Sequence, residues 1–413
     1  MKFLLLNQTF YPDVASTAQH LTDLALRLVE RGHEVTVVTS RRAYDHPEKQ
    51  FPKRELWRGI QIYRIGSTGF GKGAKWKRAA DFGSFILSCC GRLFTLPRPD
   101  VVVALTSPPL ISFLGACVAK ARGCRFFYWV MDFNPDEAIA AGWLRADSVT
   151  TRGLEWMSRF SLRRANKIIA LDRFMRDRIV AKGIAAAKVV VLPPWSHDGE
   201  VRFNPPGREQ FRRQHQLEGK FVVMYSGNHS PCHSLDTLLA AGRQLAGDSQ
   251  IIFCFVGGGS EFRKIQQLAE QQKSKDENTS IPQVKPLNIL CLPYQPLNEL
   301  SASLSAADLH VVVMGDVFVG LVHPCKIYNI LSVAAPVLYI GPRPSHLSEM
   351  LESLAEEHIC ASAGHGEAEK VAREIQNIRR QSVKVTRQVP VRVCSVFSQH
   401  TILPKLVAEL ESS

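Results

Sequence analysis

Residues 311–341, VVVMGDVFVGLVHPCKIYNILSVAAPVLYIG, carry the clearest signal of the fold. The apolar runs Val311–Val313 and Pro336–Ile340 predict two buried strands, and the segment between them predicts a loop and a helix opened by Pro324. Because proline suits the first position of a helix, the backbone N–H groups there are expected to be free and to attract an anion such as a diphosphate. Lys326, in the first turn, would add a cation to that site. The alternative is a solvated lysine on an ordinary crossover helix between parallel strands.

The same alternation of apolar strand and amphipathic helix continues outward from this segment through the whole chain. The strands that it predicts are Lys2–Leu6, Glu34–Thr39, Asp100–Leu105, Arg125–Val130, Lys167–Leu171, Lys188–Leu192, Phe221–Ser226, Ile251–Val256, Ile289–Leu292 and Leu309–Val313. A helix is predicted from Ser16 to Arg31, where apolar residues recur on one face and Gly32 ends the pattern. Strands that alternate with helices form doubly wound parallel sheets, so the predicted class is α/β.

The length of 413 residues suits two domains of roughly 200 residues each. The composition changes at residues 193–206, PPWSHDGEVRFNPP, which predict a stiff polar connector. We therefore expect an N-terminal domain over residues 1–198, a C-terminal domain over residues 199–394, and a last helix in residues 395–413 that packs back towards the first domain. The two domains are expected to be similar and to face each other across a cleft.

Composition and cysteine usage are typical of a soluble globular protein from a reducing compartment. Hydrophobic residues make up 45% of the chain and charged residues 22%, and the ten cysteines include no CxxC pair. Neither a disulfide framework nor a zinc site is therefore indicated. The apolar start of the chain is too short for a signal peptide, and residues 106–109 divide the apolar run Val101–Ala119 into a strand and a helix. We expect a cytoplasmic protein without a transmembrane segment.

The net charge of +13 lies entirely in the first half of the chain. Residues 1–198 hold 30 lysines and arginines against 17 acidic residues, whereas residues 199–413 hold 21 of each. Nucleic acid is not indicated, because the sequence contains no recognisable nucleic-acid-binding motif. An anionic membrane surface fits better, because a basic cluster around Trp76 leads into an apolar helix. The basic residues of this cluster are Lys72, Lys75, Lys77 and Arg78. Peripheral attachment through residues 72–96, at the inner face of the membrane, is the prediction; an ordinary basic surface turn is the alternative.

Open α/β sheets bind ligands beyond the C-terminal ends of their strands, so the loops at those ends hold the candidate site residues. In the second half of the chain these loops are Gly227–Ser234, Gly257–Ser260, Pro293–Leu297 and Gly315–Pro324. Their glycines would let a nucleotide approach the backbone closely. His229, His233 and Lys326 would supply positive or hydrogen-bonding groups.

Four segments have counterparts in a known family. YPDVASTAQHLTDLALRLVERGHEVTVVTS (residues 11–40) and LTSPPLISFLGACVAKARGCRFFYWVMDFNPDEAIAAG (residues 105–142) are the first two; YSGNHSPCHSLDTLL (residues 225–239) and HPCKIYNILSVAAPVLYIG (residues 323–341) are the others. In order and spacing they resemble retaining GT-B glycosyltransferases of the family 4-like group, which includes enzymes that build O-antigen, colanic acid and capsule. The resemblance covers nearly the whole chain. It implies two Rossmann-like domains, of which the first binds the acceptor and the second binds a nucleotide-sugar donor.

The resemblance also places individual residues in the donor site. The basic pair that commonly holds the diphosphate is replaced by Asn228 and His233, which leaves Lys326 as the main cation. Asn329 stands where many members have an acidic residue on the ribose, and Leu321 stands where they have a second one. The residues that the resemblance assigns to donor binding are Gly227, Asn228, His229, Gly257, Gly258, Tyr294, Pro324, Lys326, Ile327 and Asn329.

The reaction that the resemblance implies is transfer of a sugar, with retention of configuration, from a UDP- or GDP-linked donor to a lipid-linked saccharide or another glycan precursor. Lys326 and His233 would stabilise the growing phosphate charge without a metal or a further cofactor. Asp132 would position the acceptor or accept a proton; the alternative is a helix-capping aspartate. The residues expected to face the reacting sugar or the acceptor are Ser16, Thr17 and His20, although His20 also fits a structural role.

Three other functions remain open at the level of the sequence. A GT-B sugar-nucleotide epimerase would act on the donor alone, and the TSPP segment argues against it. A non-catalytic subunit that scaffolds a polysaccharide-synthesis complex is compatible with the two missing acidic residues. A dinucleotide oxidoreductase is the weakest alternative, because no GxGxxG motif follows the first predicted strand.

Overall fold

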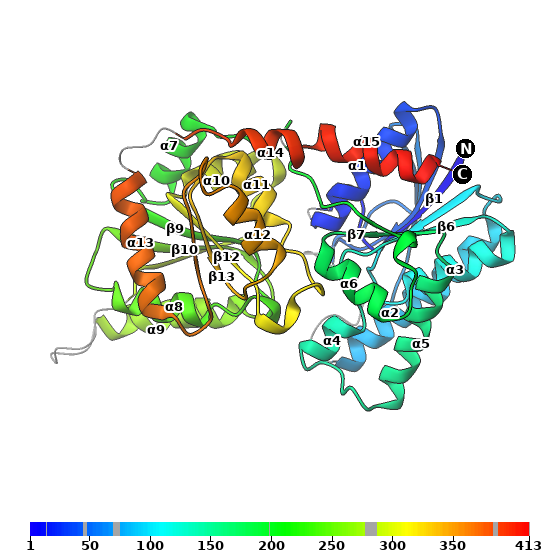
Figure 1. Cartoon of the computed structure of the whole chain (residues 1–413), viewed down its shortest axis with the longest axis horizontal. Coiled ribbons are helices and arrows are strands. Elements are labelled where there is room, and N and C mark those ends of the chain that lie inside the picture. Colours follow the sequence, from blue (N-terminus) through cyan, green and yellow to red (C-terminus); the bar gives the residue numbers. More distant parts are fainter. Residues whose placement is uncertain are drawn as a thin grey trace. The chain divides into compact units, whose positions relative to one another are not determined.

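The structure is a computed structural model that describes residues 1–13, 15–43, 48–68, 75–197, 199–276, 287–382 and 387–412. Contacts divide the chain into two compact units (Figure 1). Unit 1 consists of Met1–Pro194, Gly320–His323 and His400–Ser413, and unit 2 consists of Trp195–Val319 and Pro324–Gln399. Each unit is an α/β domain built on one mainly parallel sheet, which confirms the predicted class.

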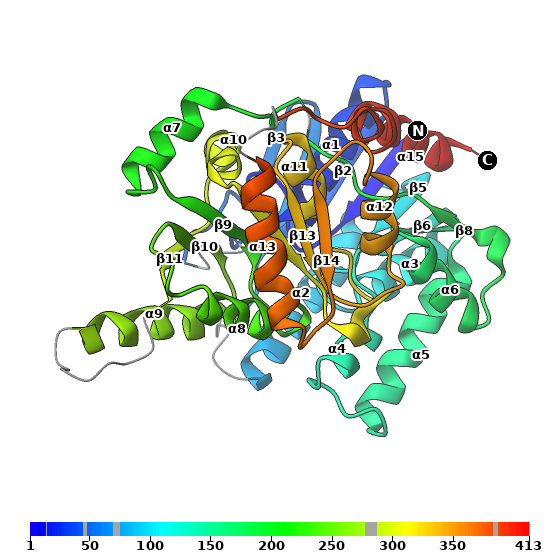
Figure 2. The ribbon, with the colours of Figure 1, turned by 60° about the vertical axis from the view of Figure 1, so that its left-hand side comes forward.

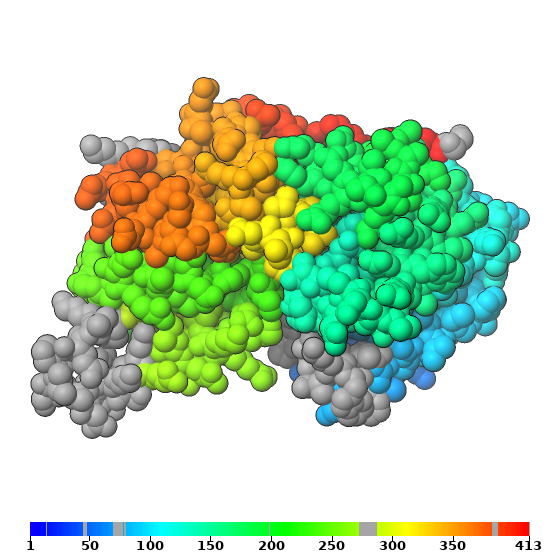
Figure 3. All heavy atoms as spheres, turned by 60° about the horizontal axis from the view of Figure 1, so that its bottom comes forward, coloured from blue at the N-terminus to red at the C-terminus, as the bar shows by residue number. Residues whose placement is uncertain are grey.

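Unit 1 contains an eight-stranded sheet in the order β3-β4-β2-β1-β5-β6-β7-β8. Its strands are β1 (Lys2–Leu6), β2 (Glu34–Ser40), β3 (Arg54–Trp57), β4 (Ile60–Ile65), β5 (Val101–Ala104), β6 (Arg125–Trp129), β7 (Lys167–Ala170) and β8 (Val189–Val191). Its helices are α1 (Ser16–Glu30), α2 (Lys75–Thr95), α3 (Ile111–Arg122), α4 (Asp136–Ala140), α5 (Val149–Arg164), α6 (Arg173–Ala181) and α15 (Gln399–Glu411). Among the helices, α3 packs against both α2 and α5, and the atoms of α5 form part of the surface in Figure 3, where they are teal.

The edge hairpin of β3 and β4 was not among the predicted strands. β3 runs antiparallel to β4, and the two are joined by Arg58 and Gly59, both with positive φ. A two-residue turn of this kind matches the twist of a hairpin. The alternation of side chains in this segment is a period-2 pattern that could have revealed it.

Unit 2 contains a six-stranded parallel sheet in the order β11-β10-β9-β12-β13-β14. Its strands are β9 (Phe221–Asn228), β10 (Ile251–Gly258), β11 (Ile289–Leu292), β12 (Leu309–Val313), β13 (Val337–Ile340) and β14 (Cys360–Ala363). Its helices are α7 (Pro205–Gln214), α8 (Asp236–Gln244), α9 (Phe262–Asp276), α10 (Leu297–Ala306), α11 (Lys326–Ser332), α12 (His346–Ser353), α13 (Ala368–Ser382) and α14 (Val391–Val396).

Both faces of this second sheet are buried, which explains why its strands are apolar at consecutive positions. On one face, Val223 and Tyr225 of β9 belong to a core that also includes Leu238 of α8 and Ile375 of α13. Figure 2 shows α13 against β13 and β14 on this face. On the other face, Met224 packs in a core with residues of α7 and α10. Helices on both faces give the doubly wound arrangement.

The predicted polar connector is largely part of unit 2. Trp195, Ser196 and His197 are buried, and Ser196 donates its backbone N–H to the carbonyl of Phe397 at 2.9 Å. Val201 packs in a small core with residues of α10 and of the segment after α11. The expectation of a free connector is wrong. Polar side chains suggested it, but the backbone of this stretch pairs with unit 2 and its apolar residues are buried.

The C-terminal helix α15 belongs to unit 1 from His400 onward and lies beside α1 in Figure 1. Its buried apolar residues include Leu403, Leu406 and Leu410. All ten cysteines of the chain are free thiols. Among the described residues, no helix is both long and apolar enough to cross a membrane.

Candidate functional site

Two of the predicted glycine loops start inside the sheet of unit 2. β9 and β10 both continue two residues beyond their predicted ends, so that Gly227 pairs with Gly257. These two glycines have φ angles of 130° and 134°, a region that favours glycine. A Cβ atom on Gly257 would lie 2.1 Å from the carbonyl oxygen of Gly227. The close pairing of the two strand ends therefore requires glycine at this position.

Lys326 lies directly over this pair of strand ends. A Cβ atom on Gly227 would lie 3.1 Å from Cε and 3.2 Å from Nζ of Lys326, so glycine leaves room for the lysine. The Nζ atom lies 3.5 Å from the ring centroid of Tyr225, in cation–π geometry. It is buried and has no hydrogen-bond partner among the residues that the structure describes. Burial holds the pKa of Lys326 well below its ordinary value.

Two histidines accompany Lys326. His229 is fully buried, with ring centroids 4.7 Å from Tyr225 and 4.8 Å from Phe262. His233 ends a short 3₁₀ turn that begins at Pro231, and its Nδ1 atom has no hydrogen-bond partner in the described parts of the chain. Burial, and then the charge of Lys326, lower the pKa of each imidazole to about 3. Both histidines are therefore neutral at physiological pH.

The helix that carries Lys326 begins later than predicted. α11 starts at Lys326 with Cys325 as its N-cap, so Pro324 precedes the helix and does not occupy its first turn. Ile327, the next residue, has a buried side chain that packs in the interior. Of the two features predicted to attract an anion, the Lys326 amine is therefore the one that the structure retains.

Asn329 is already engaged by the protein. Its Oδ1 atom accepts the backbone N–H of His197 at 3.2 Å, which ties α11 to the segment that enters unit 2. The amide oxygen predicted to bond a ribose therefore has a partner within the unit. Tyr294 packs against Gly258, where a Cβ atom would lie 3.0 Å from its ring, and Asn228 is exposed at the end of β9.

In unit 1, Asp132 follows β6 at the C-terminal edge of the sheet. Its backbone N–H donates to Thr106 Oγ1 at 3.3 Å, and the next residue, Phe133, donates its N–H to the carbonyl of Leu321. Burial raises the pKa of the Asp132 carboxyl to about 6. The interaction with His323 acts in the opposite direction and is the smaller effect. The N-cap of α4 is Pro135 and no side chain caps this helix, so the helix-capping alternative for Asp132 is wrong.

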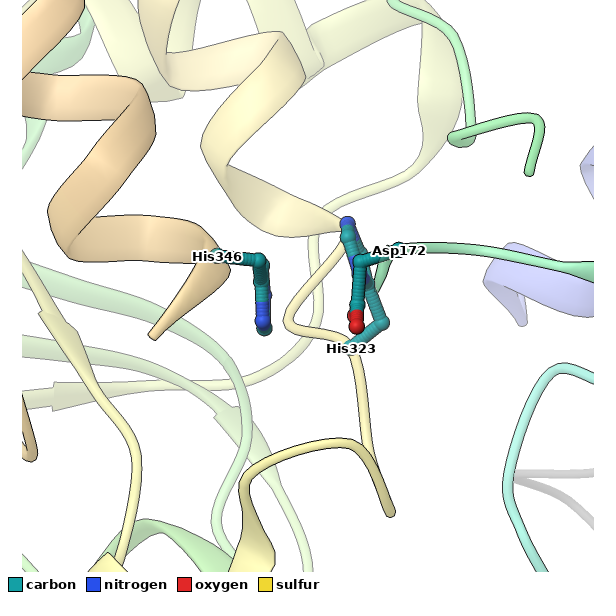
Figure 4. Close-up of side chains that lie close together, drawn as sticks. All are labelled: Asp172, His323 and His346. Atoms are coloured by element: carbon teal, nitrogen blue, oxygen red, sulfur yellow. The ribbon is translucent and has the colours of Figure 1, made fainter. Parts of the chain in front are cut away.

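Sequence reasoning missed a buried aspartate–histidine hydrogen bond at the end of the neighbouring strand. Asp172 follows β7, caps α6 by accepting the N–H of Met175, and lies 2.9 Å from Nδ1 of His323 (Figure 4). Two polar residues at the ends of adjacent strands are a signal that could have pointed to Asp172. Figure 4 also labels His346, the first residue of α12 in unit 2. Within unit 1, the pair supplies two ligands, fewer than the three that a catalytic zinc site uses.

The predicted acceptor-loop residues form a local network at the start of α1. Thr17 Oγ1 lies 3.0 Å from Thr9 Oγ1, and Nδ1 of His20 donates to the carbonyl of Ser16 at 2.8 Å. His20 is buried, in keeping with its structural alternative. The structure thus brings Lys326, Tyr225 and both histidines together in unit 2, and brings Asp132, Asp172 and His323 together in unit 1.

The predicted membrane segment is described only in part. Lys72 lies outside the described residues, as do the side chains of Lys75, Trp76 and Arg78. The rest of the segment forms α2, where Phe85 and Cys89 are buried. Leu87 and Phe94 of this helix are exposed by 75% and 67%.

Comparisons with known proteins show what the chain is similar to in sequence and in fold. Residues 17–195 match the family described as "Glycosyl transferase 4-like domain". Over 383 residues the chain is 24% identical to WcaI of Escherichia coli, named as a glycosyl transferase of colanic acid biosynthesis, and the match covers 89% of this chain and 90% of that protein.

Two solved structures share the fold over their whole lengths. HepE of Anabaena, solved with UDP and glucose, has a TM-score of 0.71 at 16% identity, covering 100% of both chains. Sucrose-phosphate synthase of Thermosynechococcus elongatus has a TM-score of 0.72 at 13% identity, covering 99% of this chain and 98% of that one.

Proposed function

We propose that the chain, which matches a glycosyl transferase 4-like domain over residues 17–195 and shares the fold of HepE, is a glycosyltransferase of this group. It moves a sugar from a nucleoside diphosphate donor to a saccharide acceptor with retention of configuration. Unit 2 binds the donor and unit 1 binds the acceptor. The donor is a UDP- or GDP-sugar; HepE, which was solved with UDP and glucose, supports UDP as the first nucleotide to test.

The observation that carries this proposal is the unpaired amine of Lys326. A buried nitrogen without a hydrogen-bond partner destabilises the free protein, and a bound anion would remove that cost. It lies beyond the strand ends of an open parallel sheet, where such folds bind ligands. A diphosphate supplies oxygens and negative charge that suit this amine.

Phosphate stabilisation by side chains is the chemistry that we assign to unit 2. When the bond between sugar and diphosphate breaks, negative charge grows on the leaving oxygen, and Lys326 opposes it. His233 is neutral and hydrogen-bonds the backbone at Val313, so it lies beside the amine without adding charge. The leaving diphosphate accepts the proton of the attacking hydroxyl, which places the new bond on the face that the nucleotide leaves. This route needs no metal and no further cofactor.

In unit 1, we assign binding of the acceptor to Asp132. Its carboxyl has a pKa of about 6, so it is mainly ionised at neutral pH and can accept a hydrogen bond from an acceptor hydroxyl. The acceptor is a lipid-linked saccharide or another glycan precursor; the similarity to WcaI supports a role in polysaccharide synthesis. A lipid-linked acceptor would keep the enzyme at a membrane surface, to which residues 72–96 attach it peripherally.

Thermal unfolding in the presence of nucleotides tests this proposal. The purified native protein is heated with UDP, GDP, ADP and their sugar conjugates, each in turn. The Lys326→Ala variant is heated with the same ligands. A ligand present at about one hundred times its Kd stabilises the fold by about 2.7 kcal/mol. We expect one nucleoside diphosphate and its sugar to raise Tm in the native protein and not in the variant. If no nucleotide stabilises the protein, a scaffolding role without catalysis is the better explanation.

A further inference from the structure

One helix of unit 1 presents an unusual outward surface. Residues 149, 152, 156, 159 and 163 of α5 recur at intervals of three and four and therefore share one face of the helix. Val149 is 84% exposed and Trp156 is 60% exposed, and the three arginines on this face are exposed as well. We call this surface the α5 outer face; its members are Val149, Arg152, Trp156, Arg159 and Arg163.

The buried residues of α5 are Leu162 and three residues with hydroxyl groups. Thr151, Ser158 and Ser161 are buried, and their hydroxyls donate to backbone carbonyls of residues 145, 134 and 157. A surface helix normally turns its large apolar residues inward and its polar residues to water. Here Leu162 and the three hydrogen-bonded residues face the interior, while Trp156 and Val149 are exposed. Packing inside unit 1 thus leaves most of the Val149 and Trp156 side chains uncovered.

Trp156 is held in place by other aromatic rings. Its ring centroid lies 5.7 Å from that of Phe113 on α3 and 5.9 Å from that of Phe160. Phe113 and Phe160 also contact each other at 5.3 Å. An exposed side chain that is supported in this way presents a rigid apolar surface to whatever binds it.

The charge of the α5 outer face indicates what binds it. Its three arginines form no ion pair among the described residues, and they outnumber the single acidic residue of the helix, Glu155, which lies three residues after Arg152 and four before Arg159. An occupant must therefore accept an apolar ring and several cations at once. Tryptophan prefers the boundary between hydrocarbon and water, and guanidinium groups bind phosphate. A bilayer that contains anionic phospholipid offers both environments in one plane.

We propose that the α5 outer face is a membrane-contact surface, which places Trp156 in the headgroup region of an anionic bilayer and its arginines on lipid phosphates. This goes beyond the attachment assigned to residues 72–96. Because α3 packs against both α2 and α5, the two surfaces flank a single helix of unit 1. This inference rests on the proposed function, in which the acceptor is lipid-linked. The α5 outer face would be a second site that holds the enzyme at the membrane.

Co-sedimentation of the full-length protein with vesicles tests the proposal. The vesicles are phosphatidylcholine alone and phosphatidylcholine with phosphatidylglycerol, at low and high salt. The test variant combines Trp156→Ser with Arg159→Gln. A matched control combines Leu56→Ser with Arg54→Gln on β3 of the same unit, where Leu56 is 69% exposed. Loss of one arginine near an anionic surface lowers affinity by about fivefold, and loss of the tryptophan adds to this.

We expect the test variant to bind anionic vesicles at least about fivefold more weakly than the native protein, and the control to bind like the native protein. Equal binding by the test variant and the native protein, or no binding of the native protein to anionic vesicles, would overturn the proposal. A native dimer that the test variant converts to a monomer, with unchanged vesicle binding, would identify a second copy as the occupant instead. Stabilisation by UDP is measured in parallel, so that failure of donor binding is distinguished from failure of membrane contact.

Discussion

Lys326 is a residue at which stability and function are expected to oppose each other. Its amine is buried without a hydrogen-bond partner among the described residues, which costs about 1–3 kcal/mol. We expect Lys326→Met to raise the free energy of unfolding by part of this amount. The same change should weaken UDP binding by about 10- to 150-fold, on the scale of a hydrogen bond to a charged group. Chemical unfolding and calorimetric titration measure the two effects.

Lys264 provides the control for this variant. It belongs to the same unit, and its side chain is 72% exposed and pairs with Glu261. Lys264→Met should leave both stability and UDP affinity nearly unchanged. Native UDP affinity in a folded Lys326→Met protein would contradict the assignment of Lys326 to the donor phosphate.

Asp132 is expected to set the acid limb of the transfer reaction. Burial raises its pKa to about 6, and the ionised form is the one that best accepts a hydrogen bond from the acceptor hydroxyl. Activity should therefore be complete above pH 7 and fall as the pH drops through 6. In Asp132→Asn this limb should disappear and kcat should fall by about 100-fold or more. A pH profile of kcat/KM in both proteins is the measurement; an unchanged acid limb in the variant would exclude Asp132.

The sequence predicted that Gly227 and Lys326 would lie close together, but not the contacts that they make. Gly227 was predicted to follow a strand and to leave room for a nucleotide, but it lies within β9 and leaves room for Lys326. Gly257 leaves room for the carbonyl oxygen of Gly227, its strand neighbour. Asn329 was assigned to a ribose, yet its oxygen accepts a backbone N–H from a residue far away in the sequence. Contacts between distant segments depend on the packed fold, and one sequence gives no information about them.

At the scale of elements, the attachment of α15 rests on a few ionic contacts beside its apolar face. Glu411 accepts from Arg31 at 2.7 and 2.8 Å and lies 2.7 Å from Nε2 of His33. Hydrogen bonds from Arg31, then from His33, lower the pKa of the Glu411 carboxyl to about 2. The stabilisation is therefore present above the ordinary carboxyl pKa of 4.5 and is lost as the pH falls from 4.5 towards 2.

We expect Glu411→Gln to loosen the end of α15 without unfolding unit 1, because Leu403, Leu406 and Leu410 still bury its apolar face. Hydrogen–deuterium exchange at neutral pH should show faster exchange in residues 400–412 and unchanged exchange in β1 and β5. Glu352→Gln, at an acidic residue of α12 in the other unit, is the control. Faster exchange across all of unit 1 would mean that the ion pair supports the whole domain.

Helix α2 gives the second prediction at this scale. Its exposed residues Leu87 and Phe94 would enter the membrane interface, and burying each would contribute about 1.5 kcal/mol or more. We expect the double variant Leu87→Ser, Phe94→Ser to bind anionic vesicles at least about tenfold more weakly. Binding should also fall with salt, because the basic residues of the segment act over about 10 Å at 0.1 M ionic strength. If the double variant binds vesicles as tightly as the native protein does, α2 is ordinary domain surface.

Most strands were predictable because both faces of each sheet are covered, so that buried strands are nearly continuous apolar runs. β1, β11 and β12 match their predicted bounds, and most of the others differ by one or two residues at an end. β3 and β4 were missed because an edge hairpin is half exposed and its pattern is weak. β14, with the sequence CASA, is also at an edge and carries small residues that signal no strand.

At the scale of the whole molecule, the prediction concerns metal. The groups that face the Lys326 amine in unit 2 are an aromatic ring and two neutral histidines, and stabilisation of the leaving diphosphate is assigned to the protein's own donors. We expect transfer to continue in excess EDTA at an unchanged rate. Product formation from a UDP-sugar, with and without the chelator, is the measurement. Activity that vanishes with EDTA and returns with magnesium or manganese would require a metal-assisted mechanism.

Unit 1 is assembled from three separate stretches of the chain, and this restricts how such a protein can be recombined. Residues 320–323 and 400–413 belong to it although they are encoded beyond most of unit 2. A crossover between related genes at the middle of the chain would therefore give unit 1 a foreign loop and a foreign terminal helix. A compatible chimera must inherit all three stretches from one parent. Donor preference can thus change more readily by substitutions in residues 195–319 and 324–399 than by an exchange of halves.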